Sequence, residues 1–517
     1  MRLLKNIQKN SVGIVLALSI LSHIFLINFN AAEWGDSYRI LRAAQLSRTG
    51  FYPIDEKRPP LFSLIIANYP EGMDPLMFGR VVMTVVSILS IVAFYFLAKR
   101  FIKSQSYLTL ALLLFWLNPV YLYWSLRIYA DVLFSLFVMC IVLLFYFYET
   151  RLNWRNSFVL GVLSAFSVLL RFEGYLLVGA LWAGLLFRNV YQKGLSQFLA
   201  NFKHFIFSVI GSVCVLVPYM VYKNPFSSSY LSEPSGREYT LTTVLIFVVS
   251  LVFSFGFLVA PVSIYLGRSK IKEFILTNYF ISFFIFFSLI LILLWPAAIP
   301  RLFVSVIPYL VIMLILAMQH IEKSKFNNLC FLTISLGSII VYATAQYFLK
   351  LQFLIVIKPV FALIIFINLL LILSVFKKRF VLSYMLTIVS VFVWAVSTLW
   401  IHKDIYKSIS EASKFVSTQY RGLVVHNDIN SVADWYLNYY PGKEHKVSGK
   451  YVKIQNESSL SRPILNDMGA SIVMITNEHD MSWQPDFSGV PYLEEIKIFR
   501  YNVNSGNFFT GVYKIKD

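Results

Sequence analysis

Charged residues, acidic residues in particular, and cysteines are all scarce in this sequence of 517 residues. Only 14% of the positions are Asp, Glu, Lys or Arg, whereas soluble proteins carry about 25%. The three cysteines, Cys140, Cys214 and Cys330, all lie within apolar stretches, where they cannot staple an external domain. Runs such as 81–98 and 274–295 contain no charge at all. These absences exclude a soluble globular enzyme, a disordered protein and a disulfide scaffold, and they leave a polytopic helical membrane protein.

Apolar stretches that are long enough, or nearly so, to cross a hydrocarbon core of roughly 30 Å recur as far as residue 401. We predict thirteen spans, at 11–29, 76–98, 106–123, 128–148, 157–170, 174–188, 204–222, 241–265, 274–295, 301–319, 328–349, 353–376 and 380–401. The fifth and sixth are short and are separated only by Arg171–Gly174, so they can form a helical hairpin that does not fully cross. The predicted fold class is mainly α, a bundle of transmembrane helices.

The formal net charge of +19 is distributed unevenly among the loops. Every second loop is basic, and together these loops carry nineteen Lys and Arg residues against three acids. By the positive-inside rule they are cytoplasmic, which places the N-terminus inside and, with thirteen spans, the C-terminus outside. We therefore predict a multi-pass protein of the plasma (inner) membrane whose first span is a signal anchor. Nucleic-acid binding, which such a charge would suggest in a soluble protein, loses its main support.

Two non-cytoplasmic segments are too long to be simple connections, so we divide the chain into two domains. Residues 1–401 form a transmembrane domain that includes a first external loop at 30–75. Residues 402–517 carry 13 basic and 13 acidic residues and read as a small extracytoplasmic α/β domain. Within it the pattern predicts helices and strands. The helices are 404–419 and 429–440, and the strands are 422–426, 470–476, 494–501 and 508–515.

Most charges outside the cytoplasmic loops gather at the outer ends of spans or in the first external loop. Such charges are expensive near a membrane, and this makes them functional candidates. Carboxylates can act as general bases or metal ligands, and guanidinium groups bind phosphate in a bidentate way. A carboxylate near a phosphate-binding cluster beside lipid fits transfer from a lipid-linked phosphate. The candidates are Glu33, Asp36, Arg58, Arg127, Asp131, Arg171, Glu173 and Arg301.

Four short motifs on this predicted outer side follow one another in a fixed order. They are 35–60 (Gly35-Asp36-Ser37-Tyr38, an Ala- and Leu-rich helix, Gly50 and Arg58-Pro59-Pro60), 127–131, 171–174 and Arg301 followed by Pro308. Together they resemble the GT-C membrane glycosyltransferases, most closely the protein O-mannosyltransferase and lipid A aminoarabinose transferase group (glycosyltransferase family 39-like). The resemblance covers most of 10–320 in layout. Ser37 departs from it, because many members have a second acid at that position.

The resemblance implies an inverting glycosyltransferase that moves a sugar from a polyprenyl-phosphate donor to a protein, lipid or glycan acceptor. Asp36 is then the general base, and Arg58 and Arg301 are phosphate ligands. Asp131 and Glu173 become metal, acceptor or structural partners. Glu33, Arg127 and Arg171 complete the substrate-binding candidates. In some members a divalent metal ion (Mg²⁺ or Mn²⁺) assists, and Asp36 and Asp131 are its candidate ligands here.

The residues also admit plainer interpretations. Arg127 and Asp131 stand at i,i+4 and can form a simple helix-end ion pair. Arg171 and Glu173 can merely hold a turn, and Arg301 can extend toward lipid headgroups. Two other functions stay open: a transporter or lipid flippase, which would predict related halves with broken spans at the midplane, and a non-catalytic anchor that presents the C-terminal domain.

Overall fold

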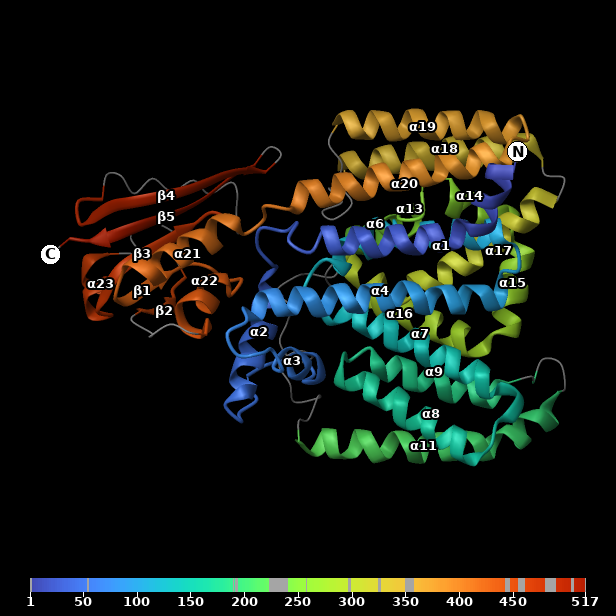
Figure 1. Ribbon diagram of the computed structural model, residues 1–517, viewed down its shortest axis with the longest axis horizontal. Helices are drawn as coiled ribbons and strands as arrows, with labels where there is room; N and C mark the ends of the chain where they lie inside the picture. The colour runs from blue at the N-terminus through green and yellow to red at the C-terminus, as the bar shows by residue number, and fades with distance from the viewer. Residues whose placement is uncertain are drawn as a thin grey trace.

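The computed structural model describes most of the chain. The described residues are 2–53, 55–188, 190, 194–222, 240–256, 258–295, 299–323, 327–348, 358–441, 447–453, 461–478, 490–503 and 506–516. They form a long helical bundle that carries a small α/β domain at one end (Figure 1). The predicted fold class is therefore confirmed.

A helix, or a pair of consecutive helices, lies at each predicted span. The bundle consists of α1 (Arg2–Phe25), α4 (Pro75–Phe101), α5 (Gln105–Trp116), α6 (Pro119–Ser125), α7 (Ala130–Tyr148), α8 (Trp154–Phe166), α9 (Gly174–Phe187), α11 (Leu195–Tyr222), α13 (Leu241–Phe253), α14 (Val259–Leu266), α15 (Arg268–Thr277), α16 (Tyr279–Leu294), α17 (Ile307–Lys323), α18 (Asn328–Phe348), α19 (Lys358–Phe376) and α20 (Phe380–His402). Six described helices are long and apolar enough to cross a membrane alone, or eight spans if each of two bent pairs counts as one.

Local sequence explains where the helices break. Asn118 accepts hydrogen bonds from the backbone N–H groups of the next turn, and Pro119 occupies the first helical position. The chain therefore bends by 58° between α5 and α6. The bend between α15 and α16 is 108°, so the basic helix α15 lies across the end of the bundle (Figure 1).

Small residues let the helices pack closely, as is usual in membranes. At the crossing of α8 and α11, a Cβ added to Gly161 would lie 2.1 Å from the carbonyl oxygen of Ser208. A Cβ on Gly211 would lie 2.2 Å from the carbonyl oxygen of Phe158. Larger residues at either glycine would push the two backbones apart.

The first external loop folds onto the end of the bundle that carries the α/β domain. It contains α2 (Gly35–Arg48) and α3 (Leu61–Ile66), which lie beside the end of α4 (Figure 1). Asp74 then caps α4 by accepting a hydrogen bond from the backbone N–H of Leu76 at 2.9 Å. The loop is thus an ordered part of the structure between two spans.

The C-terminal α/β domain has a five-stranded sheet with the order β2-β1-β3-β5-β4. β1 pairs parallel with β2 and β3, and β5 pairs antiparallel with β3 and β4. Its elements are α21 (Lys407–Gln419), β1 (Gly422–His426), α22 (Val432–Asp434), a π-helical turn (Trp435–Tyr439), β2 (Val447–Tyr451), α23 (Arg462–Asp467), β3 (Ala470–Thr476), β4 (Leu493–Val503) and β5 (Gly506–Ile515). The four predicted strands are confirmed. The helix predicted at 429–440 is instead the short α22 followed by the π-helical turn.

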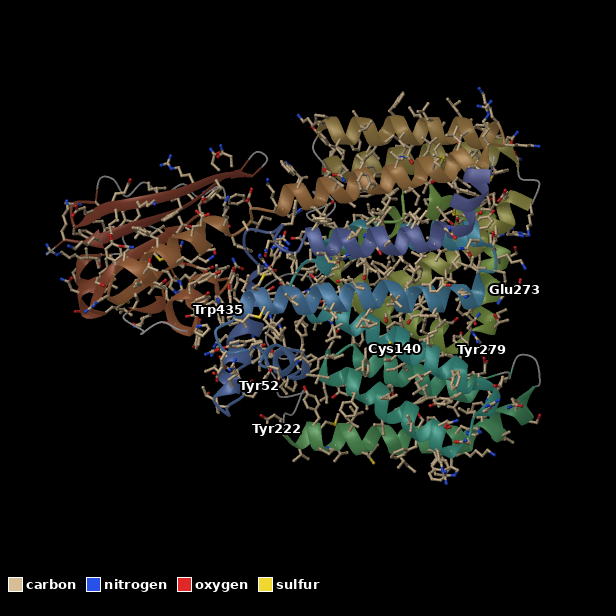
Figure 2. The ribbon with its side chains drawn as sticks, viewed as in Figure 1. Tyr52, Cys140, Tyr222, Glu273, Tyr279 and Trp435 are labelled. Atoms are coloured by element: carbon tan, nitrogen blue, oxygen red, sulfur yellow. The ribbon has the colours of Figure 1, made fainter. Side chains whose placement is uncertain are left out.

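Different elements of the structure lie at the two ends of the bundle. The N-terminus and α15 lie at one end, and the C-terminal domain with α2 and α3 lies at the other (Figure 1). Figure 2 shows the same separation in side chains, with Glu273 and Tyr279 at the first end and Tyr52 and Trp435 at the second.

The positive-inside rule predicts that this second end is extracytoplasmic. An alkaline phosphatase fused after Asp517 is therefore expected to be active, because that reporter matures only outside the cytoplasm. The matched control is the same reporter fused after Lys378, in the basic loop before α20, where it should be silent. An inactive C-terminal fusion together with an active one at Lys378 would invert the predicted orientation.

Candidate active site

A cavity of about 520 Å³ opens where α3, α7, α9 and α16 meet. One side is polar and carries the side chains of five predicted residues: Arg58, Asp131, Arg171, Glu173 and Arg301. The remaining wall is mostly apolar. Its side chains include Ile40, Phe62, Leu176, Leu291 and Trp295. The cavity thus combines a charged end with a hydrophobic end.

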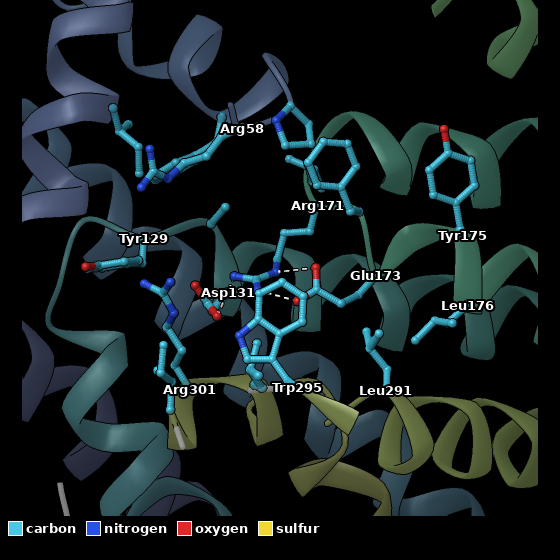
Figure 3. Close-up of a pocket in the computed structure, with 18 of the residues that line it drawn as sticks. Arg58, Tyr129, Asp131, Arg171, Glu173, Tyr175, Leu176, Leu291, Trp295 and Arg301 are labelled. Carbon is cyan, nitrogen blue, oxygen red and sulfur yellow. Dashed lines mark hydrogen bonds and ion pairs between the residues drawn. The ribbon is translucent and has the colours of Figure 1, made fainter. Parts of the chain in front are cut away.

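Arg171 bridges two carboxylates inside the cavity (Figure 3). Its Nη1 lies 2.5 Å from Oδ1 of Asp131, and its Nε donates to Oε2 of Glu173 at 3.0 Å. Asp131 is in the first turn of α7, and Glu173 precedes α9, so the bridge ties two helix N-termini together. The plainer alternative, an ion pair between Arg127 and Asp131, does not form, since Arg171 is the ion-pair partner of Asp131.

Asp36, in the first turn of α2, does not itself line the cavity but pairs with two arginines that do. Its carboxylate accepts hydrogen bonds from Nη1 of Arg301 at 2.9 Å and from Nη2 of Arg58. Its side chain is 27% exposed. Burial raises the pKa of Asp36, but Arg58 and Arg301 together more than offset this and hold the pKa well below its usual range. In this arrangement Asp36 is a charged partner of both arginines.

The two arginines are themselves held in place. Arg58 donates from its Nη1 to Oε1 of the buried Glu56 at 2.8 Å, and the backbone N–H of Arg58 donates to the same oxygen. Arg301 sits in a 3₁₀ turn after a proline, and its guanidinium lies 4.9 Å from the ring centre of Tyr129. The ring contact orients Arg301 without neutralising it, whereas Glu56 both orients Arg58 and offsets its charge.

Two predicted residues lie elsewhere. Glu33 is fully buried and pairs with Nε of Arg80 at 2.9 Å. Arg127 is also buried, and it donates to the carbonyl oxygens of Ala32 at 2.5 Å and His402 at 3.0 Å. Neither lines the cavity. Their contacts fasten the first external loop to α4 and to the end of α20, which indicates a structural role.

Two residues of the site were not singled out from the sequence. Glu56 orients Arg58, and Tyr129 lies in the cavity wall beside Arg301. Glu56 is only two positions from its partner Arg58. Tyr129 contacts Arg301, which is far away in the sequence, so no local pattern links that pair.

The predicted divalent metal ion finds no ligand set in the described ranges. Nowhere in them do three or more His, Cys, Asp or Glu side chains gather in a way that could hold an ion. Asp36 and Asp131, its candidate ligands, face guanidinium groups instead. The residues present therefore do not fit a metal site, and we derive no step through one.

Arg171→Met is expected to destabilise the protein strongly, because it leaves Asp131 and Glu173 in the cavity wall without their cation. Removing one partner of a buried ion pair costs about 3–5 kcal/mol. The check is the thermal unfolding midpoint in detergent. The control is Lys270→Met, which breaks the exposed pair with Glu273 and should cost about 0–1 kcal/mol. Adding Asp131→Asn to Arg171→Met should recover part of the loss, and no recovery would contradict the bridge.

Comparison with known proteins places the fold. No protein-family model and no curated protein sequence matches the chain. The fold is nevertheless similar to that of solved structures. In particular, it is similar to the crystal structure of ArnT from Cupriavidus metallidurans in the apo state, with a TM-score of 0.59 and 11% sequence identity over 97% of each chain.

The crystal structure of the same ArnT bound to undecaprenyl phosphate gives a TM-score of 0.57 and 10% identity, again over 97% of each chain. At such identities the likeness establishes the fold. ArnT is a lipid A aminoarabinose transferase, one of the group that the sequence motifs resemble. The resemblance is thus confirmed at the level of architecture.

Proposed function

We propose that the protein is a membrane glycosyltransferase that moves a sugar from a polyprenyl-phosphate donor to an extracytoplasmic acceptor with inversion. One observation carries the proposal. The cavity places the guanidinium groups of Arg58 and Arg301 at one end and an apolar wall at the other, in a bundle whose fold is similar to that of ArnT. A polyprenyl-phosphate sugar has the same division, with an anionic headgroup and a hydrocarbon chain.

The headgroup phosphate binds Arg58 and Arg301. Both guanidinium groups line the cavity at its polar end, and neither can lose its charge at accessible pH. Planar guanidinium groups match phosphate oxygens with two parallel hydrogen bonds. As the sugar–phosphate bond breaks, negative charge grows on the phosphate, and fixed cations in a partly dry site stabilise it.

The isoprenoid chain occupies the apolar wall, along Phe62, Leu176 and Leu291. The ArnT of similar fold has been crystallised with undecaprenyl phosphate, and this supports a ligand of the same class here. The chain already lies among lipid tails, so moving it against the protein gains little hydrophobic free energy. The apolar wall accommodates the chain, and the arginines supply most of the binding energy and the specificity for phosphate.

Asp36 is the general base. In the resting site it is paired with the same two arginines that bind phosphate, so it is a poor base there. An arriving phosphate competes for these arginines, and the pKa of Asp36 then rises toward its ordinary value. Asp36 takes the acceptor's hydroxyl proton, the acceptor oxygen attacks the anomeric carbon, and polyprenyl phosphate departs with the bonding electrons.

Asp131 contacts the sugar. It is 3% exposed and lines the cavity. Arg171 takes one carboxylate oxygen, and the second has no hydrogen-bond partner among the described residues. A buried acceptor without a partner is costly, and a sugar hydroxyl can satisfy it. Glu173 keeps Arg171 in place for this contact.

Binding of undecaprenyl phosphate tests the proposal. It should raise the thermal unfolding midpoint of the purified protein, because a ligand that binds only the folded state stabilises it. Undecaprenol, which has the same chain without phosphate, is the control and should stabilise much less. Equal shifts with both lipids would leave the arginines without a role and contradict the proposal.

A further inference from the structure

The carboxyl ends of β1 and β3 face the end of the helical bundle (Figure 1). These two strands are parallel neighbours. β2, the next strand after β1 along the chain, lies on the other side of β1 from β3. Open sheets bind their ligands at such a reversal of strand order, just beyond the carboxyl ends. Here that position is filled by segments of the chain itself, including the connection from α20.

The connection is held by Glu478, which follows β3. Its carboxylate accepts hydrogen bonds from the backbone N–H of Tyr406 at 2.6 Å and from Oγ of Ser408 at 2.5 Å. Beside it, Asn427 joins the two strand ends through a pair of hydrogen bonds to Thr476, at 2.9 and 2.8 Å. The edge of the sheet is thereby fixed to the end of the last span.

The conformation of the loop after β1, residues 428–431, is fixed by hydrogen bonds. The carboxylate of Asp428 accepts hydrogen bonds from the backbone N–H groups of Asn430 and Ala433, both at 2.8 Å. Asp428 is only 3% exposed. Ser431 adopts a left-handed backbone conformation with φ of 61°, which an L-residue keeps only when its surroundings impose it.

This loop rests against the first turn of α2. A Cβ added to Gly35 would lie 2.4 Å from the carbonyl oxygen of Asn430. One turn further, Nε of Arg39 donates to Oγ of Ser431 at 3.3 Å. The rings of Tyr38 and Tyr436 pack edge to face, with centres 5.9 Å apart, near the junction where Figure 2 labels Trp435. In the sequence, Asp36 lies between Gly35 and Arg39, which both contact the loop.

We propose that the 428–431 loop of the C-terminal domain is a positioning clamp, which seats the start of α2 so that Asp36 meets Arg58 and Arg301. The function of the clamp rests on the proposed role of Asp36. Gly35 is the residue that allows the contact, because its missing side chain gives the loop backbone room. The C-terminal domain thus positions the catalytic apparatus, although none of its described residues lines the cavity.

Gly35→Ala tests the clamp. The added methyl meets a backbone oxygen that Asp428 holds in place, so α2 has to move and carry Asp36 with it. A displacement of about 1 Å can cost 10²-fold in rate. We therefore expect about a hundredfold loss of turnover, measured with an undecaprenyl-phosphate sugar that the wild type uses. Affinity for undecaprenyl phosphate should be kept or increased, because the displaced Asp36 competes less for the two arginines.

Two further variants complete the experiment. Asp428→Ala releases the loop from the other side and should give the same signature of lost turnover with retained affinity. Gly13→Ala is the matched control, because a Cβ there meets nothing within 4 Å. Wild-type turnover in Gly35→Ala and Asp428→Ala would overturn the clamp. So would a joint loss of turnover, affinity and thermal midpoint, since that pattern describes general unfolding.

Asp36→Asn, measured in parallel, separates this proposal from the proposed function. If Asp36→Asn is inactive and Gly35→Ala is fully active, only the clamp fails. If Asp36→Asn retains activity, the general-base role fails, and with it the reason for a clamp.

Discussion

Asp36→Asn is expected to abolish sugar transfer and, at the same time, to bind undecaprenyl phosphate more tightly than the wild type. The loss of the general base should lower turnover by about 10²–10⁴-fold. The gain in affinity arises because Asp36 occupies both phosphate-binding arginines in the resting site. Removing its charge frees them, and a tenfold tighter complex corresponds to about 1.4 kcal/mol.

Two measurements check this expectation, the turnover of an undecaprenyl-phosphate sugar and the dissociation constant of undecaprenyl phosphate. Asp55→Asn is the matched control, since Asp55 lies in the same loop, is 62% exposed and pairs with Arg42. It should change neither quantity by more than a few fold. Turnover of Asp36→Asn within a few fold of the wild type would remove Asp36 from the base role. Weaker binding would contradict the competition for the arginines.

Arg301→Gln is expected to weaken binding of undecaprenyl phosphate by about 10- to 100-fold. Hydrogen bonds to charged groups contribute about 1.5–3 kcal/mol, and Arg301 provides one of the cations at the polar end of the cavity. The same change should raise KM for the donor much more than KM for the acceptor, because the phosphate belongs to the donor alone.

The control for this variant is Lys57→Gln, which removes a cation that lies next to Arg58 in the sequence but outside the cavity wall. It should leave the affinity for undecaprenyl phosphate nearly unchanged. Equal effects of Arg301→Gln on KM for the donor and KM for the acceptor would show that Arg301 acts through the overall charge of the site and does not bind the phosphate. No effect at all would exclude it from phosphate binding.

The helices of the bundle and four of the five strands of the C-terminal sheet could be predicted from the sequence because their signals are local; β2 was not predicted. Long charge-free runs predict spans, and apolar runs flanked by turn residues predict strands such as 470–476. The helix predicted at 429–440 forms only over 432–439, as a short α-helix followed by a π-helical turn, for a tertiary reason. Asp428 draws the chain into a tight turn there, and only a short helical segment follows.

The candidate site was predictable only in part, because its pairs join distant segments. Asp36 and Arg301 are 265 positions apart, and no local pattern links them. Spacing allowed Arg127 as a partner of Asp131, yet the fold turns Arg127 toward the backbone carbonyls of Ala32 and His402. The residues of the motifs gather at one end of the molecule, and the structure sorts the charges there into cavity and scaffold.

The central claim is that the cavity binds a polyprenyl-phosphate sugar and breaks its sugar–phosphate bond. The most direct measurement is to incubate the purified protein with a panel of undecaprenyl-phosphate sugars and to follow the release of undecaprenyl phosphate. We predict release from at least one member of the panel by the wild type, and none above background by Asp36→Asn. Release at equal rates by both proteins, or a wild type that neither binds nor cleaves any member, would contradict the account.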